Sequence, residues 1–575
     1  MTAVHPSVIL IPGGVVSLFL PPRWRGWFGV FIPVLALVTV FCLKTGKSWY
    51  VSFLGQFDLI LLQVDSLALL FAGTYAVMAL VNMSYSFHVR QKTELGMALI
   101  YTGASMGVIF SGDWLTLIAF WELMAVSSSV IVWLGGRNRS AKAALRYIMV
   151  HFFGGNLLLA GIVLKVSSGN PYIESLTGTG DAAFWLILAG VLINAAAPPL
   201  HSWLTDAYPE ASPTATVWMN MLTTKIGVYM LIKVFPGTDV LIIVGIVAAL
   251  YGVIYAILEN NTRRLLSYHI ISQVGLMTAA VGIGSDLALN GAAALAIGNI
   301  LYKSLLFMSI GAVVYQTGKE KLTELGGLSS EMPAVTAFFA IGALAISGFP
   351  LLNGFISKPL ITTAASYHGF PVVEHLLYLA SAGTFLSIPL KMGYFAFFRT
   401  FDKRKKLLNE RLPAGMYMAM GTVAGLCFLF GLHPHLLYQQ LPFSFSYQPY
   451  VWKKVGSELL FFTGISSGFW LMLSNMKTRE VTTFDTDWFY RKPLVVMVDA
   501  VARNLNLLGA FVNLKAAGVL KWSVPFWDNP FRWIDIFNRE QAPAKFDPDF
   551  YRTSMGWLIV PSIFVFIVTI LYIYK

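Results

Sequence analysis

Charged residues are scarce in this sequence. Asp, Glu, Lys and Arg make up only 12% of its 575 residues, whereas 57% are hydrophobic. Water-soluble domains carry about 25% charged residues, and a soluble protein could not cover its surface with so few. The composition therefore excludes a soluble enzyme and indicates an all-helical protein that crosses the membrane many times.

Cysteine is scarcer still, with only Cys42 and Cys427, in separate apolar stretches. Neither has the spacing typical of a metal site, an iron–sulfur cluster or a c-type haem, so both are expected to be buried packing residues. We therefore expect no redox centre, metal or other cofactor in this chain. The N-terminal MTAVHPSVIL also lacks the basic region of a secretory signal peptide, which predicts that the first apolar stretch is a retained helix.

Apolar stretches of helical length predict about sixteen transmembrane helices. They fall near residues 7–20, 27–43, 59–83, 96–111, 114–135, 147–167, 183–200, 214–234, 239–258, 266–284, 289–316, 334–365, 376–398, 414–431, 455–475 and 553–574. We group them as an N-terminal set (1–95), two five-helix units (96–235 and 236–400), a further pair (401–476), a cytoplasmic-side segment (477–552) and a last helix (553–575).

The basic residues predict how these helices are oriented. If the helices alternate in direction, 29 of the 40 Lys and Arg residues fall on one side of the membrane and 5 on the other. Because Lys and Arg stay on the cytoplasmic side, this pattern predicts a prokaryotic cytoplasmic-membrane protein with both termini outside. The net charge of +12 then reflects topology and not nucleic-acid binding.

The segment before the last helix is unusual. Residues 493–520 are apolar but contain Asp499, Arg503 and Lys515, and basic residues flank both ends. Two basic flanks favour a helix along the cytoplasmic face, about 40 Å long. An extra span followed by a re-entrant segment is the alternative. The aromatic and proline-rich stretch at 521–533 favours an interfacial strap.

Two predicted helices, the seventh and the twelfth, contain prolines in mid-stretch. Pro198 and Pro199 interrupt the seventh and Pro350 the twelfth, and each break is followed by a leucine, a polar residue and an aromatic residue. An offset of five helices makes the two units inverted repeats. Broken helices at matching positions of inverted repeats mark ion or substrate sites; ordinary proline kinks with a chance similarity are the alternative.

A few charged residues fall at mid-membrane positions, where each costs at least about 2.5 kcal/mol. A structural protein has no reason to carry several of them, so they predict a proton or cation relay, with buried pairs that fix helix packing as the alternative. The members are Glu122, Lys225, Lys303, Lys358 and Lys391. Lys165 and Lys233 lie nearer helix ends and are expected to reach the membrane surface.

Three histidines are further relay candidates, because an ordinary histidine pKa near 6.5 suits proton exchange. His151 lies inside the sixth predicted helix, His201 follows the first proline break and His269 begins the tenth. His201 is the strongest of the three by position. Each is otherwise explained as a hydrogen-bonded packing residue.

Five segments resemble the antiporter-like subunits of respiratory complex I, of Mrp cation/proton antiporters and of membrane-bound hydrogenases. They read FWELM, PPLHSWLTDAYPEASPTATVWMNMLTTKIGVY, ENNTRRLLSYHIISQVG, LYKSLLFMSIGAV and SGFPLLNGFISKP, in the same order over residues 60–400. DTDWFYRKP (485–493) is similar to the C-terminal part of the D-type subunits of Mrp antiporters. The predicted helices after residue 450 resemble the longest complex I antiporter-like subunit, whose lateral helix clamps its neighbours.

The resemblance implies roles for the buried charges. Glu122, Lys225, Lys303 and Lys358 match the residues that form a hydrated axis in this family, which moves protons or exchanges them for Na⁺. Redox chemistry in other subunits supplies the energy. The expected partners are therefore other antiporter-like subunits, small membrane subunits, redox subunits and membrane lipid, and no nucleic acid.

Two departures from the family pattern stand out. By motif register, the lysine usual on the seventh helix is Asn194 here, and histidines usual on the eleventh helix are replaced by Asn299 and Leu295. Because its usual lysine partner is missing, Glu122 is expected either to pair with Lys225 or to be largely protonated.

Three functions fit these observations. The first is an ion-translocating subunit of a larger complex, which the retained Lys225, Lys303 and Lys358 favour. The alternatives are a subunit for inorganic-carbon uptake and a structural brace whose ion path is degenerate, and Asn194 favours the brace. The sequence does not distinguish H⁺ from Na⁺ as the transported ion.

Overall fold

The computed structural model describes residues 4–53, 57–89, 91–400, 411–473 and 485–528, together with 563 and 565. The chain divides into two compact units, residues 1–484 and 485–575, and each is described by itself. Apart from residues 563 and 565, the predicted sixteenth helix (553–574) lies outside the described residues.

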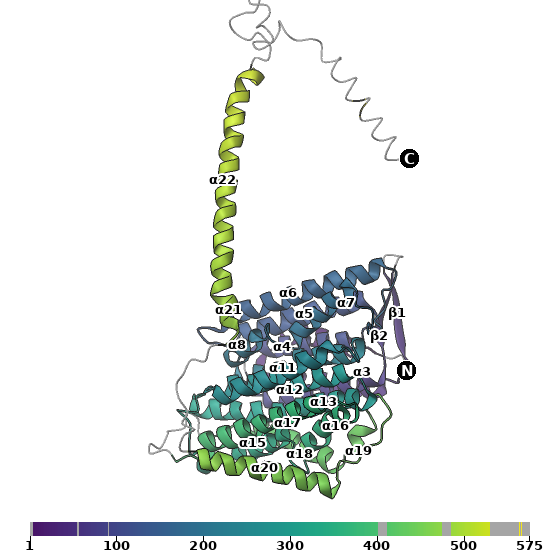
Figure 1. Ribbon diagram of the computed structural model, residues 1–575, viewed down its shortest axis with the longest axis vertical. Coiled ribbons are helices and arrows are strands. Elements are labelled where there is room, and N and C mark those ends of the chain that lie inside the picture. The colour runs from purple at the N-terminus through teal and green to yellow at the C-terminus, as the bar shows by residue number, and fades with distance from the viewer. Residues whose placement is uncertain are drawn as a thin grey trace, which may run out of the picture. The chain divides into compact units, whose positions relative to one another are not determined.

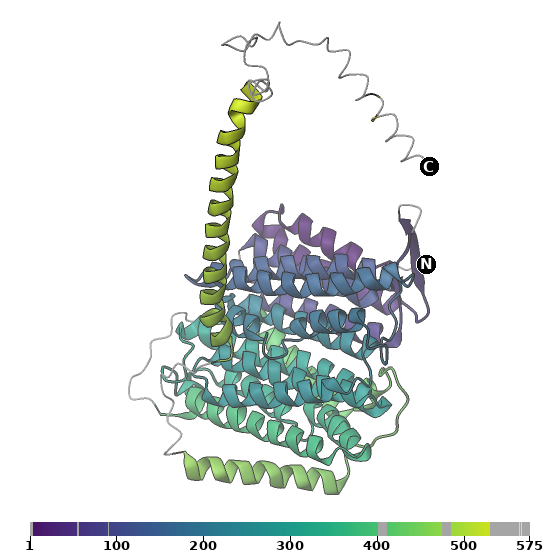
Figure 2. The same cartoon turned by 45° about the horizontal axis from the view of Figure 1, so that its top comes forward.

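The first unit is a bundle of helices that lie side by side (Figures 1 and 2). Its main helices are α1 (Ser7–Ser17), α2 (Pro22–Cys42), α3 (Ser66–Tyr85), α4 (Lys92–Phe110), α5 (Trp114–Trp133), α6 (Ser140–Ser167), α7 (Ala182–Asn194), α8 (Ser202–Glu210), α9 (Pro213–Met221), α10 (Thr223–Val234), α11 (Val240–Leu258), α12 (Thr262–Ile283), α13 (Asp286–Thr317), α15 (Pro333–Ser347), α16 (Asn353–Tyr367), α17 (Pro371–Phe385), α18 (Ala414–Leu432) and α20 (Trp452–Met472). Two four-residue helices, α14 (Leu328–Glu331) and α19 (His435–Tyr438), lie in the loops.

The described part of the chain contains twelve helices long and apolar enough to cross a membrane, with α1, α7 and α15 as shorter apolar helices. Each of the first fifteen predicted stretches overlaps one to three of the observed helices. The chain is therefore a mostly helical, multi-span membrane protein, as its composition predicts.

The third predicted span begins later than expected, because its first residues form a strand. β1 (Ser48–Phe53) pairs antiparallel with β2 (Phe57–Gln63), and Asp65 caps the start of α3 by accepting a hydrogen bond from the Ala68 amide (2.7 Å). The Ile60 amide donates to Asp113 Oδ2 (2.7 Å), which joins the hairpin to the start of α5. The expectation of helix at 59–65 is thus wrong, since a short apolar run fits a strand as well as a helix.

The two cysteines differ in their surroundings. Cys427 of α18 is buried, as expected, whereas Cys42, the last residue of α2, is exposed. Most of α2 faces away from the bundle, so an apolar residue on it need not be buried. The prediction of burial is therefore wrong for Cys42.

α11 and α12 pack with their backbones in very close contact. A methyl group added at Gly275 of α12 would lie 2.4 Å from the Ala249 nitrogen and 2.6 Å from the Gly245 oxygen of α11. Small residues allow such contacts between membrane helices. The contact fixes α12, which carries His269 and other groups of the site described below.

The second unit contains α21 (Asp487–Arg491) and α22 (Pro493–Asp528), a 36-residue helix about 54 Å long. The helix predicted at 493–520 is present and extends farther, so the first eight residues of the expected interfacial strap are helical. Residues Val495–Val524 are long and apolar enough to cross a membrane. Their orientation along the membrane surface therefore stays a prediction.

Candidate functional site

The seventh helix is interrupted where the sequence predicts a break. α7 ends at Asn194, and α8 begins after a segment that contains Pro198 and Pro199, joined by a cis peptide bond. Ala196, in this segment, has a left-handed backbone with φ of 57°. The indole of Trp203 donates to a carbonyl in the last turn of α7, that of Ile193 (3.0 Å).

The twelfth helix has a similar break. α15 ends at Ser347 and α16 begins at Asn353, with Pro350 between them. Leu351 adopts a left-handed backbone with φ of 73°, and it and Ala196 are the two residues other than glycine with positive φ in the described part of the chain. Such conformations cost about 1–3 kcal/mol and concentrate at functional sites.

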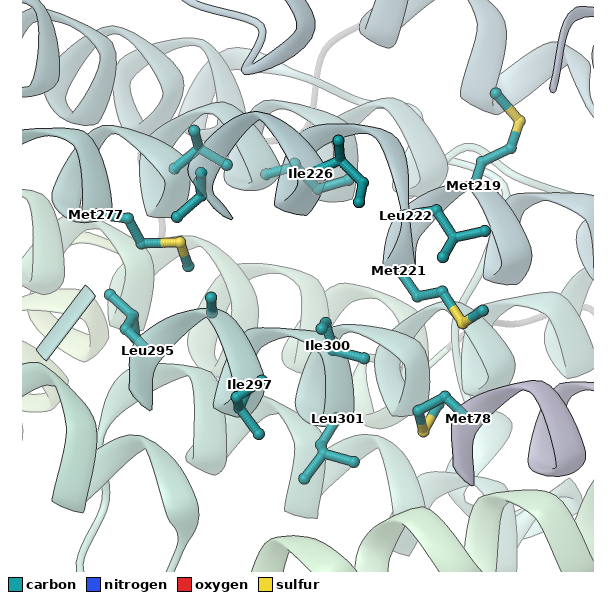
Figure 3. Packing of buried hydrophobic residues seen from close by; sticks show 14 of the residues in the cluster. Met78, Met219, Met221, Leu222, Ile226, Met277, Leu295, Ile297, Ile300 and Leu301 are labelled. Atoms are coloured by element: carbon teal, nitrogen blue, oxygen red, sulfur yellow. The ribbon is translucent and has the colours of Figure 1, made fainter. Parts of the chain in front are cut away.

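A third break is not predicted by the sequence. α9 and α10 meet at Leu222, whose φ of −105° and ψ of −80° lie outside the helical range. No proline or glycine lies between Pro213 and Gly227 to signal this break. Figure 3 shows Leu222 at this break, with Met221 of α9 before it and Ile226 of α10 after it.

Lys225 donates a hydrogen bond to a backbone carbonyl beside this third break. The lysine is fully buried, and its Nζ donates to the Asn220 carbonyl (2.8 Å) and to Thr224 Oγ1 (3.3 Å). The Asn220 side chain donates to Ser304 Oγ (3.2 Å), the neighbour of Lys303 along α13. Polar groups thus link the surroundings of two buried lysines.

Lys303 is also fully buried. Its Nζ donates to the Leu266 carbonyl of α12 (2.8 Å) and lies 6.0 Å from the ring centre of Phe307. Three residues farther along α12, His269 Nε2 forms a hydrogen bond with Ser387 Oγ (2.7 Å). α12 therefore supplies both a partner for Lys303 and an imidazole that points toward Ser387, in the predicted span 376–398.

Lys391 lies in a π-helical continuation of α17, formed by η1 (Leu386–Met392) and η2 (Tyr394–Phe398). Its Nζ donates to the carbonyls of Ile257 (2.5 Å) and Glu259 (2.7 Å) at the C-terminal end of α11. A helix C-terminus carries partial negative charge, which accounts for a buried cation here. The sequence predicts the lysine but not the π-helix, a feature frequent at functional sites.

Lys358 lies in the second turn of α16. It is 6% exposed, and its ammonium has no hydrogen-bond partner among the described residues. Within that part of the chain, none of the four buried lysines (Lys225, Lys303, Lys358 and Lys391) has a carboxylate oxygen within 4.0 Å. Backbone and hydroxyl oxygens, not acids, are their observed partners.

Two of the predicted histidines lie beside the seventh-helix break. The His151 ring packs against Tyr147 and Trp203, with ring centres 4.2 and 4.5 Å away, and lies close to Asn194. The Tyr147 hydroxyl in turn contacts Thr223 Oγ1 (3.3 Å) at the third break. His201, just before α8, is buried with its ring centre 4.7 Å from that of Tyr251.

A second polar chain runs beside Lys303. Asn299 donates to the Tyr302 hydroxyl (3.3 Å), which donates to Gln273 Oε1 of α12 (3.2 Å). Asn299 lies at a position where the resemblance predicts histidine, and its partners in this chain are a phenol and a second amide. They hold hydrogen bonds, but they do not titrate near neutral pH.

Glu122 forms no ion pair with the four buried lysines among the described residues. It is half-buried on α5, against Gly155 of α6, where an added methyl group would lie 1.9 Å from its Oε1. The ion pairs of the described residues do not include one between Glu122 and Lys225. The structure therefore does not show the expected pair, and the expectation of a largely protonated Glu122 stays a prediction.

A charged cluster at one end of the bundle was not found from the sequence. Glu320, in the loop after α13, accepts from Arg137 (3.0 Å) and from Arg263 (3.2 Å), and Arg263 also donates to the carbonyls of Tyr208 (2.7 Å) and Pro209 (2.8 Å) in α8. Burial acts to raise the pKa of Glu320, but the two guanidinium groups outweigh it and hold the pKa below its ordinary value. The cluster ties loops of both five-helix units together.

The comparisons with known proteins agree with this architecture. Residues 111–387 match the family model for the transmembrane region of the NADH:quinone oxidoreductase/Mrp antiporter proteins. The D-type subunit of the Na⁺/H⁺ antiporter from Alkalihalophilus pseudofirmus is 31% identical over 287 residues, which cover 45% of this chain and 56% of that protein. The A-type subunit of the same antiporter is 28% identical over 428 residues, covering 65% and 52%. The chain thus spans about half the length of each.

Solved structures share the fold. A chain of the Mrp complex from Dietzia sp. DQ12-45-1b superposes with a TM-score of 0.66 at 21% identity, covering 76% of this chain and 96% of that one. A chain of respiratory complex I from Thermus thermophilus gives a TM-score of 0.68 at 19% identity, covering 80% and 100%. A chain of an archaeal membrane-bound sulfane sulfur reductase gives 0.67 at 22% identity, covering 81% and 99%.

Proposed function

Because residues 111–387 of this chain match the family model of the NADH:quinone oxidoreductase/Mrp antiporter proteins, we propose that it is a proton-translocating membrane subunit of a multisubunit, redox-driven complex. One observation supports this most: Lys225, Lys303 and Lys358 are buried without a carboxylate partner among the described residues. A cation at membrane depth is costly unless it serves a function.

The geometry suggests an order for proton movement. Protons enter through the chain of His151, Tyr147 and Thr223, reach Lys225, and pass Asn220 and Ser304 to Lys303. They then pass His269 on the way to Lys358. Because neighbouring cations repel each other, a proton on one lysine disfavours a proton on the next, so the sites fill alternately.

Lys225, Lys303 and Lys358, which we call the lysine axis, favour H⁺ over Na⁺ as the ion that moves along them. An ammonium group repels Na⁺ but exchanges protons with water. Hard cations prefer carboxylate and carbonyl oxygens, and the described residues hold no group of three His, Cys, Asp or Glu side chains arranged for a metal ion. If Na⁺ is exchanged for protons, we place its binding outside the lysine axis.

Loss of one axis lysine tests the proposal. In the whole complex in proteoliposomes, Lys225→Met should lower proton transport by about tenfold or more. The variant removes a proton-binding group from the path, and an increase of only about 1.4 kcal/mol in the barrier slows a step tenfold. Lys165→Met is the matched control, because Lys165 pairs with the exposed Asp181 (3.1 Å) near a helix end. Unchanged transport in Lys225→Met would contradict the proposal.

Asn194 favours a second candidate function, a brace with a degenerate ion path. In that case Lys358→Ala would reduce assembly of the complex, and the complexes that survive would transport ions at the normal rate. The ion path predicts the reverse for Lys358→Ala: normal assembly, judged by native electrophoresis, with transport lost.

We place the complex in the prokaryotic cytoplasmic membrane, with both termini outside and α22 along the cytoplasmic face against neighbouring antiporter-like and small membrane subunits. The asymmetry of the basic residues supports this orientation. Single cysteines at Ser48 in the hairpin and Arg139 in the α5–α6 loop, in a Cys42→Ser background, test it. An impermeant thiol reagent should label position 48 from outside intact cells and position 139 only in inverted vesicles.

We also assign a membrane lipid to the apolar cleft of about 470 Å³ between α2, α3, α13 and α18. The cleft extends along α3 from Ser66 to Val77, about 16 Å or half the hydrocarbon thickness. Hydroxyl and amide groups at Thr45 and Gln440 lie among its lining. This length and lining fit one acyl chain of a phospholipid in one leaflet.

Two glycines allow a matched test of the lipid site. Gly73 lines the cleft, and Gly425 is an exposed residue of α18. A Cβ added at either position would have no other atom within 4 Å. Gly73→Leu should therefore fill the cleft and lower the phospholipid retained on purification, measured by mass spectrometry, whereas Gly425→Leu should not. Equal lipid retention in both variants would contradict the assignment.

A further inference from the structure

A small cavity lies beside Lys358, between the broken twelfth helix, α17 and α20. Its volume is about 20 Å³, and its lining includes Ser347, Lys358, Tyr378, Ser381 and Glu458. Four of these residues come from helices already linked to the site. The fifth, Glu458, lies on α20, a helix at the edge of the bundle (Figures 1 and 2).

The cavity has the size and the polar lining to hold one water molecule. A site for one water needs about 10–15 Å³ and two to four polar partners. Lys358 contributes an ammonium group that is buried and has no hydrogen-bond partner among the described residues. Tyr378, Ser381 and Glu458 add two hydroxyls and a carboxylate. A hydrated metal ion is too large for this volume.

Glu458 is placed to exchange a proton with Lys358 through that water. The two side chains lie within electrostatic range of each other, but the ion pairs of the described residues, each within 4.0 Å, do not include this pair. Lys358 is likewise within electrostatic range of Lys303. The cavity therefore continues the lysine axis toward α20 instead of closing it with a direct salt bridge.

Glu458 also lies near one membrane surface. It is half-buried and six residues from the start of α20, about 9 Å along the helix. Tyr447, in the segment that precedes α20, accepts a hydrogen bond from Lys454 (3.0 Å), and both side chains lie within electrostatic range of Tyr367 at the end of α16. The end of α16 and the start of α20 thus lie at the same surface, and Glu458 lies between Lys358 and that surface.

We propose that the Lys358–Glu458 cavity is a proton-binding site that holds one water molecule, and that Glu458 is the acid through which the proton path opens to that surface. This inference rests on the proposed function. The Lys358 ammonium gives a proton to the water, the water gives one to the Glu458 carboxylate, and the carboxylic acid releases it to bulk water. Lys358, now neutral, takes its next proton from the Lys303 side.

The first test compares acid variants in the whole complex in proteoliposomes. Glu458→Gln should lower proton transport by tenfold or more, and Glu458→Asp should retain part of it. Glu174→Gln is the control, because Glu174 is exposed in the α6–α7 loop. Normal transport in Glu458→Gln together with lost transport in Lys225→Met would overturn the inference and leave the proposed function intact. Normal transport in both would overturn both.

A chemical rescue separates a proton-carrying role from a structural one. In a Cys42→Ser background, Glu458→Cys complexes are assembled first and then treated with thiol reagents, since Cys427 is buried. A reagent that adds a carboxylate should restore transport, and a neutral reagent of similar size should not. Equal rescue by both, or by neither when the labelling is complete, would show that Glu458 does not carry the proton.

Discussion

Among single residues, Asn194 lies at the position where the resemblance predicts a lysine. Its side chain is buried at the end of α7, next to a break that has kept its prolines and its strained backbone. The Nδ2 atom has no hydrogen-bond partner among the described residues, and neither does Nε2 of the nearby His151. The side chain at position 194 is therefore polar but uncharged, as the motif register predicts.

Asn194→Lys should alter proton transport if the missing charge limits the first half of the axis. A cation at the C-terminal end of α7 is favoured by the helix dipole, and a coupling of only about 0.7 kcal/mol changes a rate about threefold. We expect a change of at least that size in the transport rate of assembled complexes in proteoliposomes. Asn194→Gln is the control; identical rates in both variants would show that position 194 does not limit transport.

Lys391 is a single residue for which the structure supports a structural role as much as a functional one. Its two bonds to carbonyls at the end of α11 should contribute about 1–2 kcal/mol, so Lys391→Met should lower the midpoint of thermal unfolding in detergent. Transport per assembled complex should remain above half of the wild-type rate. If transport is lost while the unfolding midpoint is unchanged, Lys391 belongs to the ion path.

At the scale of elements, the α11–α12 contact depends on the absence of side chains. A Cβ at Gly275 would lie within 2.6 Å of backbone atoms of α11, which cannot move as a side chain can. Gly275→Ala should therefore push the helices apart and cost about 1–3 kcal/mol, measured as a lower unfolding midpoint in detergent. Gly425→Ala, where the added methyl meets nothing within 4 Å, should leave the midpoint unchanged or raise it slightly, because alanine favours a helix more than glycine does.

The elements that the sequence predicts are those with a strong local signal. Apolar stretches located the helices of the first unit, and Pro198, Pro199 and Pro350 located two breaks, because proline removes a backbone donor that a helix needs. The break at Leu222 and the π-helix at Lys391 have no such signal. Both depend on packing against helices far away in the sequence, and so does the hairpin, whose second strand is held by Asp113.

The candidate site was predictable to the same extent. A buried lysine stands out in an apolar stretch, so Lys225, Lys303 and Lys358 were found, but their carbonyl partners were not, because every residue has a carbonyl. Glu458 was missed because it lies near the start of its span, where a charge is unremarkable. Only the fold places it beside Lys358.

At the scale of the whole molecule, Glu320 joins the two five-helix units at one end. Its carboxylate is largely buried between Arg137 and Arg263. Glu320→Gln would leave the buried Arg263 and the partly exposed Arg137 with a weaker partner and should cost about 3 kcal/mol of unfolding free energy. The control is Glu324→Gln, since Glu324 is exposed and pairs loosely with Lys319 and Lys321 (3.9 and 4.0 Å), so its loss should cost less than about 1 kcal/mol.

The same cluster predicts how stability depends on pH. The pKa of Glu320 is below its ordinary value of 4.5 in the folded protein, so the unfolded chain takes up a proton first as pH falls. Its stabilising contribution is complete above pH 4.5 and is lost as pH falls through the folded-state pKa. Unfolding midpoints in detergent, measured between neutral and acid pH, should fall less steeply for Glu320→Gln than for the wild type; equal slopes would exclude this contribution.

The Glu320 cluster also restricts how the two five-helix units can move relative to each other. With the loops at that end fastened by buried charges, relative motion takes the form of a rotation about the fastened end, so displacement grows with distance from it. A rotation of about 2° moves groups at the opposite surface, roughly 30 Å away, by about 1 Å. α15 and α16 run from the Glu320 end toward that opposite surface. A one-ångström displacement is comparable to the tolerance of a hydrogen bond, so a tilt of about 2° would make or break hydrogen bonds between the two five-helix units at that surface while the bonds of Glu320 stay intact.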